Sequence, residues 1–387
     1  MEKRGNLVNK VNQEALRLLL IAFMVAHAAN DGFNAIFPPL LPLIREHFHL
    51  SYAQLGGFLS LFRFFGSFLQ IPVSYLSHFI PSSTIMVSGL LWLSTGMLLA
   101  TFAGSYWMLA SAFSFAGIGR ASYHPLSFSL LSRVFPKKRL GRIVGLHMGA
   151  SSAAHLIAPF LVILLANKFG WYWPIRLWCL YGIMAASFLL VVLRRHIGKE
   201  EKVEGKALRL PFISSSLVFY CLFRICWAIA RNGMSTFLPL FLVEKAHFSI
   251  KVATLYYIAM YLMEVITRPM IGAYSDKVGK RKPVILGECV LFGVLFLSLT
   301  IFQTQLVLLI IILGIGLFAG TIPVVAQTYA IEMIPSEHRE RTLGFVFTIS
   351  TTTTTFTPLI IGFLADYLGL IQSFIILPSL IGVGMFF

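Results

Sequence analysis

Charged residues are scarce in this sequence. Asp, Glu, Lys and Arg make up 12% of its 387 residues, whereas a typical soluble protein carries about 25%. The four cysteines, at positions 179, 221, 226 and 289, have no metal-ligand spacing and predict no zinc site. No glycine-rich phosphate loop ending in Lys-Ser or Lys-Thr is present, which argues against transport or chemistry driven by ATP. Disordered chains and disulfide-stapled secreted domains are excluded by the same composition.

Apolar residues take the place of the missing charges. They make up 57% of the chain, with 35 Phe, and the mean hydropathy is +0.82. About 20 helical residues cross the hydrocarbon core of a bilayer. The apolar runs therefore predict an all-α integral membrane protein with twelve transmembrane helices, at about 14–44, 51–77, 82–104, 106–134, 140–167, 171–193, 211–243, 248–275, 283–302, 305–333, 341–366 and 369–387.

The net charge of +16 would favour nucleic acid as the partner of a soluble protein. Here the basic residues gather in alternate connections, namely the N-terminal segment, 133–142, 194–209, 277–282 and 339–341. The connections between them hold only Arg45, Lys168, Lys245 and Lys251. Positive loops face the cytoplasm, so the pattern predicts a multi-pass protein of the cell membrane with both termini in the cytoplasm. The same charge pattern makes the lipid bilayer the expected partner and excludes nucleic acid as a partner.

The two halves of the sequence repeat each other. Pro159 and Gly170 recur 199 residues later as Pro358 and Gly369, and His47-Phe48 recurs 200 residues later as His247-Phe248. The only long polar stretch lies between the halves. We therefore predict an N-terminal bundle of six helices (1–193), a cytoplasmic linker (194–210) and a C-terminal bundle of six (211–387), related by a pseudo-two-fold axis along the membrane normal.

A loop in the second half carries a recognisable pattern. The segment Gly272-Ala-Tyr-Ser-Asp276-Lys-Val-Gly279-Lys280-Arg281 resembles the G-x-x-x-D-x-x-G-[RK]-[RK] loop of the major facilitator superfamily. The resemblance implies the major facilitator fold and a cytoplasmic gate. It assigns gating roles to residues of this loop and to the two repeated prolines: Gly272, Asp276, Gly279, Lys280, Arg281, Pro159 and Pro358.

Two further segments point to a narrower group. The stretch from His27 to Asp31 (HAAND) and the stretch from Gly117 to Pro125 (GIGRASYHP) resemble the fosmidomycin-resistance type of facilitator. This resemblance implies efflux of drugs or small anionic compounds against protons, without a cofactor. Arg120 stands where the resemblance would place a small polar residue.

Ionisable side chains within a membrane span are costly unless they face a cavity or a partner, so each is a functional candidate. Asp31 lies one helical turn from His27, and we expect it to bind and release the coupling proton. His124 and Glu264 are the other candidates for proton coupling. The alternatives are a static ion pair between Asp31 and a neighbouring arginine, and a structural pair between Glu264 and Arg268.

Arginine rather than lysine occupies the middle of the spans. A guanidinium binds carboxylate, phosphate or phosphonate through two parallel hydrogen bonds and keeps its charge when partly desolvated. The excess of buried arginines over buried carboxylates predicts an anionic substrate, although each arginine could equally form an interhelical pair. The predicted substrate-binding residues are Arg63, Arg120, Arg224, Arg231, Tyr123, His155 and Gln327. We expect no metal site, because no carboxylate-rich cluster accompanies the histidines.

These patterns favour a secondary transporter that works by alternating access. The working hypothesis is proton-coupled export of a small organic anion or drug by a monomer, and uptake by proton symport is the close alternative. An intramembrane enzyme is a weaker alternative, because the sequence has neither a metal-ligand cluster nor a nucleophile elbow.

Overall fold

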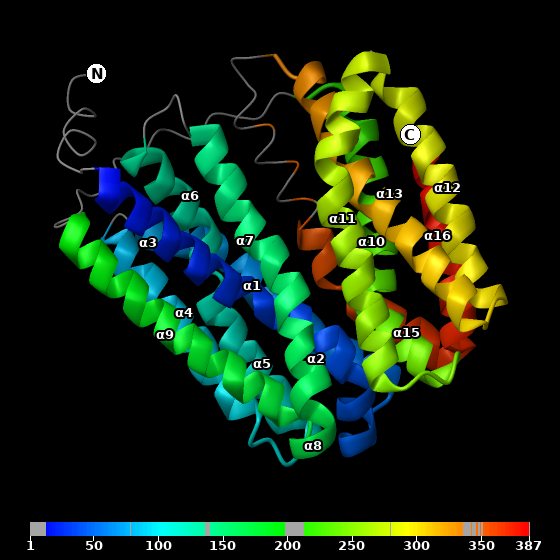
Figure 1. Ribbon diagram of the computed structural model, residues 1–387, viewed down its shortest axis with the longest axis horizontal. Coiled ribbons are helices and arrows are strands. Elements are labelled where there is room, and N and C mark those ends of the chain that lie inside the picture. Colours follow the sequence, from blue (N-terminus) through cyan, green and yellow to red (C-terminus); the bar gives the residue numbers. More distant parts are fainter. Residues whose placement is uncertain are drawn as a thin grey trace. The chain divides into compact units, whose positions relative to one another are not determined.

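A computed structural model describes residues 13–77, 79–135, 140–197, 213–278, 280–335, 342, 346, 349 and 351–386 (Figure 1). The regular elements among these residues are helices, and none of the described residues lies in a strand. The predicted all-α fold class is therefore confirmed.

Contacts along the chain divide the protein into two compact units. The first comprises Met1–Phe37 and Leu61–Lys206, and the second comprises Pro38–Ser60 and Ala207–Phe387. Of the predicted linker, only residues 194–197 are among those the structure describes. The predicted bundle boundaries at 193 and 211 stay a prediction.

The first unit contains the first part of α1 and the last part of α2, followed by seven helices in chain order. Their bounds are α1 (Gln13–Phe48), α2 (Tyr52–Phe68), α3 (Gln70–Leu76), α4 (Ser82–Ala100), α5 (Tyr106–Arg120), α6 (Tyr123–Val134), α7 (Leu140–Leu161), α8 (Asn167–Phe169) and α9 (Tyr172–His196). Aromatic side chains fill its interior, where the ring centroids of Phe37 and Phe113 are 4.7 Å apart.

The second unit contains the remainder of α1 and α2 and the helices of the second half. These are α10 (Ser215–Glu244), α11 (Ile250–Val278), α12 (Arg281–Ile301), α13 (Gln305–Met333), α15 (Thr357–Leu368) and α16 (Leu370–Met385). The Trp227 and Phe292 rings pack with centroids 4.7 Å apart, and Phe241 stacks on Phe374 at 4.5 Å. The shared α2 is held here by its N-terminus, where the Asp366 carboxylate accepts hydrogen bonds from the backbone N–H groups of Tyr52 and Ala53, each at 2.8 Å.

Prolines interrupt two of the predicted spans. α2 gives way to α3 at Leu69, and α5 gives way to α6 at Ala121 and Ser122. Pro72 and Pro125 follow shortly after these breaks. A proline ring collides with the carbonyl four residues earlier and offers no N–H, so a helix is broken just before it. The second and fourth predicted spans are therefore each two helices, and His124 lies in the first turn of α6.

The glycines of the internal repeat have the same backbone conformation. Gly170 follows α8 with φ of 96°, and Gly369 follows α15 with φ of 94°. Residues with side chains rarely adopt this region, so both positions require glycine. The 199-residue offset predicted from the sequence is confirmed at this pair.

The turn after α1 is built like the turn after α10. His49 has φ of 53° and His247 has φ of 56°. Each histidine is followed two residues later by a serine, Ser51 or Ser249. The Ser51 hydroxyl accepts a hydrogen bond at 3.2 Å from the backbone N–H three residues later, and the Ser249 hydroxyl accepts the equivalent bond at 3.3 Å. Each serine therefore caps the helix that follows. The structural counterpart of His247 is thus His49, 198 residues earlier, and the predicted equivalence with His47 is wrong by two positions.

Nine helices among the described residues are long and apolar enough to cross a bilayer, and α15 and α16 are shorter apolar helices. This set is consistent with the predicted multi-pass architecture. The count of twelve spans and the orientation of the termini stay predictions.

Candidate functional site

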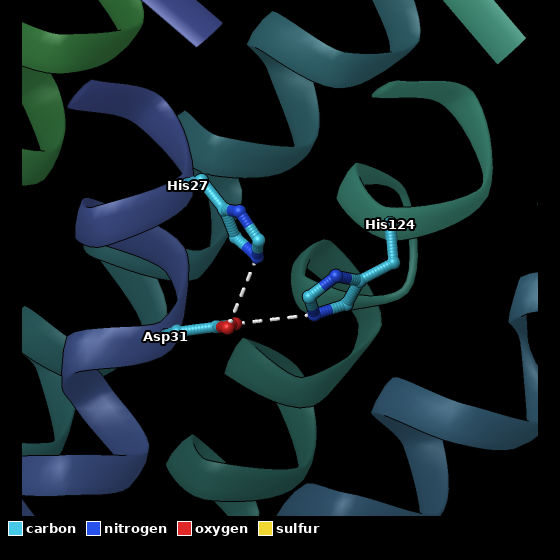
Figure 2. Close-up of side chains that lie close together, drawn as sticks. All are labelled: His27, Asp31 and His124. Atoms are coloured by element: carbon cyan, nitrogen blue, oxygen red, sulfur yellow. Dashed lines mark ion pairs between the residues drawn. The ribbon is translucent and has the colours of Figure 1, made fainter. Parts of the chain in front are cut away.

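The Asp31 carboxylate lies at the centre of a polar cluster inside the first unit (Figure 2). One of its oxygens, Oδ2, is 3.1 Å from Nε2 of His27, and the other, Oδ1, is 3.1 Å from Nε2 of His124. Asn30 donates a hydrogen bond to Oδ1 at 2.9 Å, and Ser151 donates one to Oδ2. The side chain of His27 is fully buried and that of Asp31 is 12% exposed. We call His27, Asp31 and His124 the His–Asp cluster.

Three helices bring these groups together. His27 and Asp31 are four residues apart on α1 and therefore share one face. His124 reaches the carboxylate from the first turn of α6, and Ser151 reaches it from α7. The predicted proximity of His27 and Asp31 is confirmed, and His124 joins them through the break that Pro125 imposes. The proton-coupling role of these residues stays a prediction.

A histidine of α7 supports the cluster. His147 is buried, and its ring stacks on that of His27 with centroids 4.1 Å apart. Its backbone carbonyl lies 2.8 Å from Nδ1 of His27. A carbonyl oxygen only accepts hydrogen bonds, so Nδ1 of His27 must carry the hydrogen. The contact therefore fixes which tautomer a neutral His27 would adopt.

Arg120 lies one turn along from the His–Asp cluster. It ends α5, four residues before His124, and it faces Asn34, three residues after Asp31 on α1. With the Asn34 amide oxygen turned toward it, Asn34 accepts hydrogen bonds from Nη2 at 2.8 Å and from Nε at 3.2 Å. Among the residues the structure describes, no carboxylate lies within ion-pair distance of Arg120. The guanidinium is thus held by a neutral amide.

Two of the other predicted substrate-binding residues have their polar atoms engaged within the first unit. The buried Tyr123 donates its hydroxyl hydrogen to the backbone carbonyl of Phe23. Nδ1 of His155 donates to the carbonyl of Ser151 on the same helix at 3.0 Å. These contacts are typical of structural hydrogen bonds, and a substrate-binding role for either residue stays a prediction.

A second charged cluster lies in the second unit. Glu264 of α11 accepts a hydrogen bond from Nη2 of Arg231, on α10, and its other oxygen is 2.9 Å from Nη2 of Arg268, one turn later on α11. The Glu264 side chain is 3% exposed. The predicted structural pair between Glu264 and Arg268 is confirmed as a contact. The guanidinium of Arg231 also lies over the Tyr261 ring, 5.4 Å from its centroid.

The remaining predicted substrate-binding residues are partly buried and lie on three different helices. Arg63 is on α2, Arg224 is on α10 and Gln327 is on α13. Nε of Arg224 is buried and has no hydrogen-bond partner among the described residues. Arg63 belongs to the first unit, and Arg224 and Gln327 belong to the second.

The predicted gate is described in part. α11 continues to Val278, so the backbone of Gly272 and Asp276 belongs to its last turns. Gly279 lies outside the described residues. Lys280 precedes α12, and Arg281 forms an ion pair with Glu332 at 3.0 Å.

The two repeated prolines have different surroundings. Pro159 lies inside α7, three residues before a π-helical turn, Val162–Ala166. A proline and a π-turn are the usual causes of a bend in a helix. Pro358 begins α15 instead, and its carbonyl oxygen lies so close to Gly56 that any side chain at position 56 would collide with it.

The His–Asp cluster is also the one place among the described residues where three side chains offer metal-ligand atoms close together. These atoms, from His27, Asp31 and His124, lie within 4.8 Å of one another. In Figure 2 both imidazoles point at the carboxylate itself. The two imidazoles thus contact the carboxylate directly, and the absence of a metal stays a prediction.

Sequence reasoning assigned no role to four residues of this site, namely Asn30, Asn34, His147 and Ser151. Asn34 follows Asp31 by three residues, so its place on the same face could have been found from helical spacing. His147 gave no such signal, because it stands alone in an apolar stretch far from His27 in sequence.

Comparisons with known proteins agree with this architecture. The family profile described as Major Facilitator Superfamily matches residues 23–287 and 252–387. Over 280 residues the chain is 24% identical to the fosmidomycin resistance protein of Escherichia coli K12, covering 70% of this chain and 68% of that protein. Over 170 residues it is 29% identical to the probable nitrate transporter NarT of Staphylococcus carnosus, covering 44% of this chain and 42% of that one.

A solved structure has the same fold. It is a bacterial homologue of the human lysosomal transporter Spinster, in an inward-facing and occupied conformation. The TM-score is 0.80 at 14% identity, covering 97% of this chain and 96% of that one.

Proposed function

Because this chain belongs to the Major Facilitator Superfamily, we propose that it is a proton-coupled transporter of small anions. Membership makes it a multi-pass membrane transporter rather than an enzyme, and transport by alternating access follows from the family's two-bundle design. The observation that carries the proposal is that the His–Asp cluster lies beside Arg120, a cation with no carboxylate within ion-pair distance among the described residues.

The His–Asp cluster supports the proton-coupling part of the proposal. Imidazole is the side chain that changes its charge near neutral pH. Two imidazoles that contact one buried carboxylate form a unit that gains or loses a proton with little rearrangement of the backbone. The His124 side chain is 26% exposed, and we propose that it connects this unit to water.

Arg120 supports the anion-binding part. A buried guanidinium without a counter-ion is costly, and an incoming oxyanion would remove that cost through two parallel hydrogen bonds. The similar proteins are named for fosmidomycin and for nitrate. Nitrate is a planar oxyanion that matches a guanidinium fork.

The direction of transport depends on how the proton and the anion affect each other. Export against protons, as the resemblance to a resistance protein favours, requires the two to compete. Uptake with protons requires them to bind together. We also propose that the chain functions as a monomer in the cell membrane with both termini in the cytoplasm, in line with its basic connections.

Flux into liposomes tests the proposed function. Liposomes containing the purified full-length chain should accumulate nitrate or fosmidomycin when a pH gradient is imposed, and should not accumulate a cation of similar size. Arg120→Ala should abolish the anion flux, whereas Arg194→Ala, at the exposed end of α9, should leave it intact. Transport of the cation, or equal anion flux by the wild type and Arg120→Ala, would contradict the proposal.

A further inference from the structure

A cavity of about 150 Å³ lies at one end of the second unit. α10 and α12 begin at this end, and α13 and α16 finish at it. Side chains from all four helices line the cavity, and most of them are aromatic or aliphatic, including the buried Phe223 of α10 and Ile285 of α12. None of the lining residues belongs to either charged cluster described above. We call this space the Lys282 cavity, after the one basic residue in its lining.

Lys282 gives the cavity a positive charge. It is exposed in the first turn of α12 and forms no ion pair with any residue that the structure describes. The preceding residue, Arg281, differs from it, because Glu332 already neutralises Arg281 at 3.0 Å. The lining, as far as it is described, contains no carboxylate. The cavity therefore attracts an anionic group.

Tyr220 adds an unused hydrogen-bond donor. It lines the cavity and is 4% exposed, and its buried hydroxyl has no hydrogen-bond partner within the described part of the chain. A buried tyrosine hydroxyl usually finds a partner, and one that lacks a partner costs free energy. An oxygen of a bound molecule would supply the missing acceptor. Ser216 and Tyr329 bring two more hydroxyls to the lining.

The volume of the cavity restricts what can bind. Pockets for drug-sized molecules have about 300–1,000 Å³, whereas a cavity of about 150 Å³ holds a group the size of benzene. A larger molecule must therefore leave most of its mass outside. Exposed apolar side chains are available for that part, namely Phe219 in the lining and Phe386 directly after the lining residue Met385. A molecule with a small anionic group and a long apolar part meets both conditions.

The position of Lys282 in the sequence indicates the depth of the cavity in the bilayer. Lys282 belongs to the basic segment 277–282, which the predicted topology places at the cytoplasmic surface. The cytoplasmic leaflet carries the anionic phospholipids, and basic pockets between transmembrane helices on this side bind their headgroups.

We propose that the Lys282 cavity binds the headgroup of one anionic phospholipid of the cytoplasmic leaflet. Lys282 pairs with the phosphate, Tyr220 donates a hydrogen bond to an oxygen of the lipid, and the acyl chains lie against the exposed apolar side chains. The lipid joins α12 to α13 beside the Arg281–Glu332 ion pair, because Lys282 follows Arg281 and Tyr329 precedes Glu332 by three residues. This proposal goes beyond the proposed function and holds for any transported substrate.

Lipid titration of the purified full-length chain tests this proposal. The delipidated protein in detergent receives phosphatidylglycerol, phosphatidylcholine or inorganic phosphate. Bound molecules are counted by native mass spectrometry, and the unfolding temperature is measured in parallel. One phosphatidylglycerol per chain should bind about tenfold more tightly than phosphatidylcholine, whose choline cation offsets the phosphate charge beside Lys282. Phosphatidylglycerol should also raise the unfolding temperature, whereas inorganic phosphate should not.

Two variants distinguish a role in lipid binding from a structural role. Lys282→Ala should weaken phosphatidylglycerol binding about tenfold or more. The matched variant Lys277→Ala removes an exposed charge of the same basic segment that does not line the cavity, and it should bind as wild type. Tyr220→Phe should weaken binding about fivefold. It should nevertheless raise the unfolding temperature of the lipid-free protein, because it removes the unpartnered hydroxyl.

Three outcomes would contradict the proposal. Equal affinity for the two phospholipids, or wild-type phosphatidylglycerol affinity in Lys282→Ala, would show that the headgroup is not recognised here. Inorganic phosphate that binds as tightly as phosphatidylglycerol would show a site for a free anion instead of a lipid. The comparison of the two phospholipids needs no variant, so it remains decisive if Lys282→Ala does not fold. No transported substrate is present, so failure here leaves the proposed function standing, and failure of the flux experiment leaves the lipid site standing.

Discussion

Each unit holds a buried carboxylate between two nitrogen-bearing side chains, but the kind of side chain differs. Asp31 contacts His27 on its own helix and His124 from another, and Glu264 contacts Arg268 on its own helix and Arg231 from another. In each unit the carboxylate contacts one side chain four residues away on its own helix and one side chain from another helix. Imidazoles titrate near neutral pH and guanidiniums do not. The first cluster is therefore suited to carry a proton and the second to hold helices together.

This difference argues against one predicted role. Glu264 was expected to take part in proton coupling, with a structural pair as the alternative. Two permanent cations on a carboxylate that is 3% exposed favour the alternative. We therefore propose that Glu264 joins α10 to α11 and that Arg231 is less available than Arg120 for a substrate.

The largest expected effect comes from breaking the second cluster. Glu264→Gln removes the counter-ion of Arg231 and leaves a buried guanidinium uncompensated, which should lower the free energy of unfolding by about 3–5 kcal/mol. Denaturant unfolding in detergent measures it. Glu332→Gln, which breaks the ion pair of Arg281 with a carboxylate that is 51% exposed, should cost about 0–1 kcal/mol. Equal losses in the two variants would show that Glu264 is not a structural counter-ion.

A smaller effect is expected at Arg120. Arg120→Ala should weaken anion binding by about 1.5–3 kcal/mol, because one charge-assisted contact is lost, while the protein still folds. Arg120→Lys should recover part of the affinity, since the charge remains but the planar fork does not. Calorimetry with nitrate measures both. Wild-type affinity in Arg120→Ala would mean that the anion binds elsewhere, with Arg63 and Arg224 as the next arginines to replace.

The smallest effect is expected at Gly66. A Cβ there would lie 3.0 Å from Nη1 of Arg120 and 3.2 Å from its Cδ. The flexible guanidinium can shift by a few tenths of an ångström, so Gly66→Ala should weaken nitrate binding about fivefold by misaligning the fork. Thermal stability should change little. An unchanged affinity would place the anion on the opposite side of the guanidinium.

Much of this fold follows from the sequence. The lengths of the apolar segments predict the helices. The internal repeat predicts that Gly170 and Gly369 occupy equivalent turns, and their backbone angles confirm this. The interruptions at Leu69 and Ala121 were not predicted, although Pro72 and Pro125 cause them. The hydropathy of the sequence does not reveal a break in a helix, because a proline changes the hydrogen bonding of the helix without shortening the apolar segment.

The site was predictable only where its residues share a helix. Helical spacing gives the His27–Asp31 and Glu264–Arg268 pairs. Contacts between helices, such as Asp31 with His124 or Arg231 with Glu264, depend on tertiary packing that spacing does not encode. The excess of buried arginines predicted an anion, but the structure alone distinguishes Arg120, held by an amide, from Arg231, held by a carboxylate.

Movement of protons together with nitrate tests the coupling role of the His–Asp cluster. Liposomes that contain the protein and a lumenal pH indicator receive an inward nitrate gradient. The wild type should change the lumenal pH as nitrate enters, and Asp31→Asn should lose both this pH change and gradient-driven accumulation while it still exchanges nitrate between equilibrated sides. A pH change by Asp31→Asn at the wild-type ratio of protons to nitrate would contradict the assignment of the coupling proton to the His–Asp cluster.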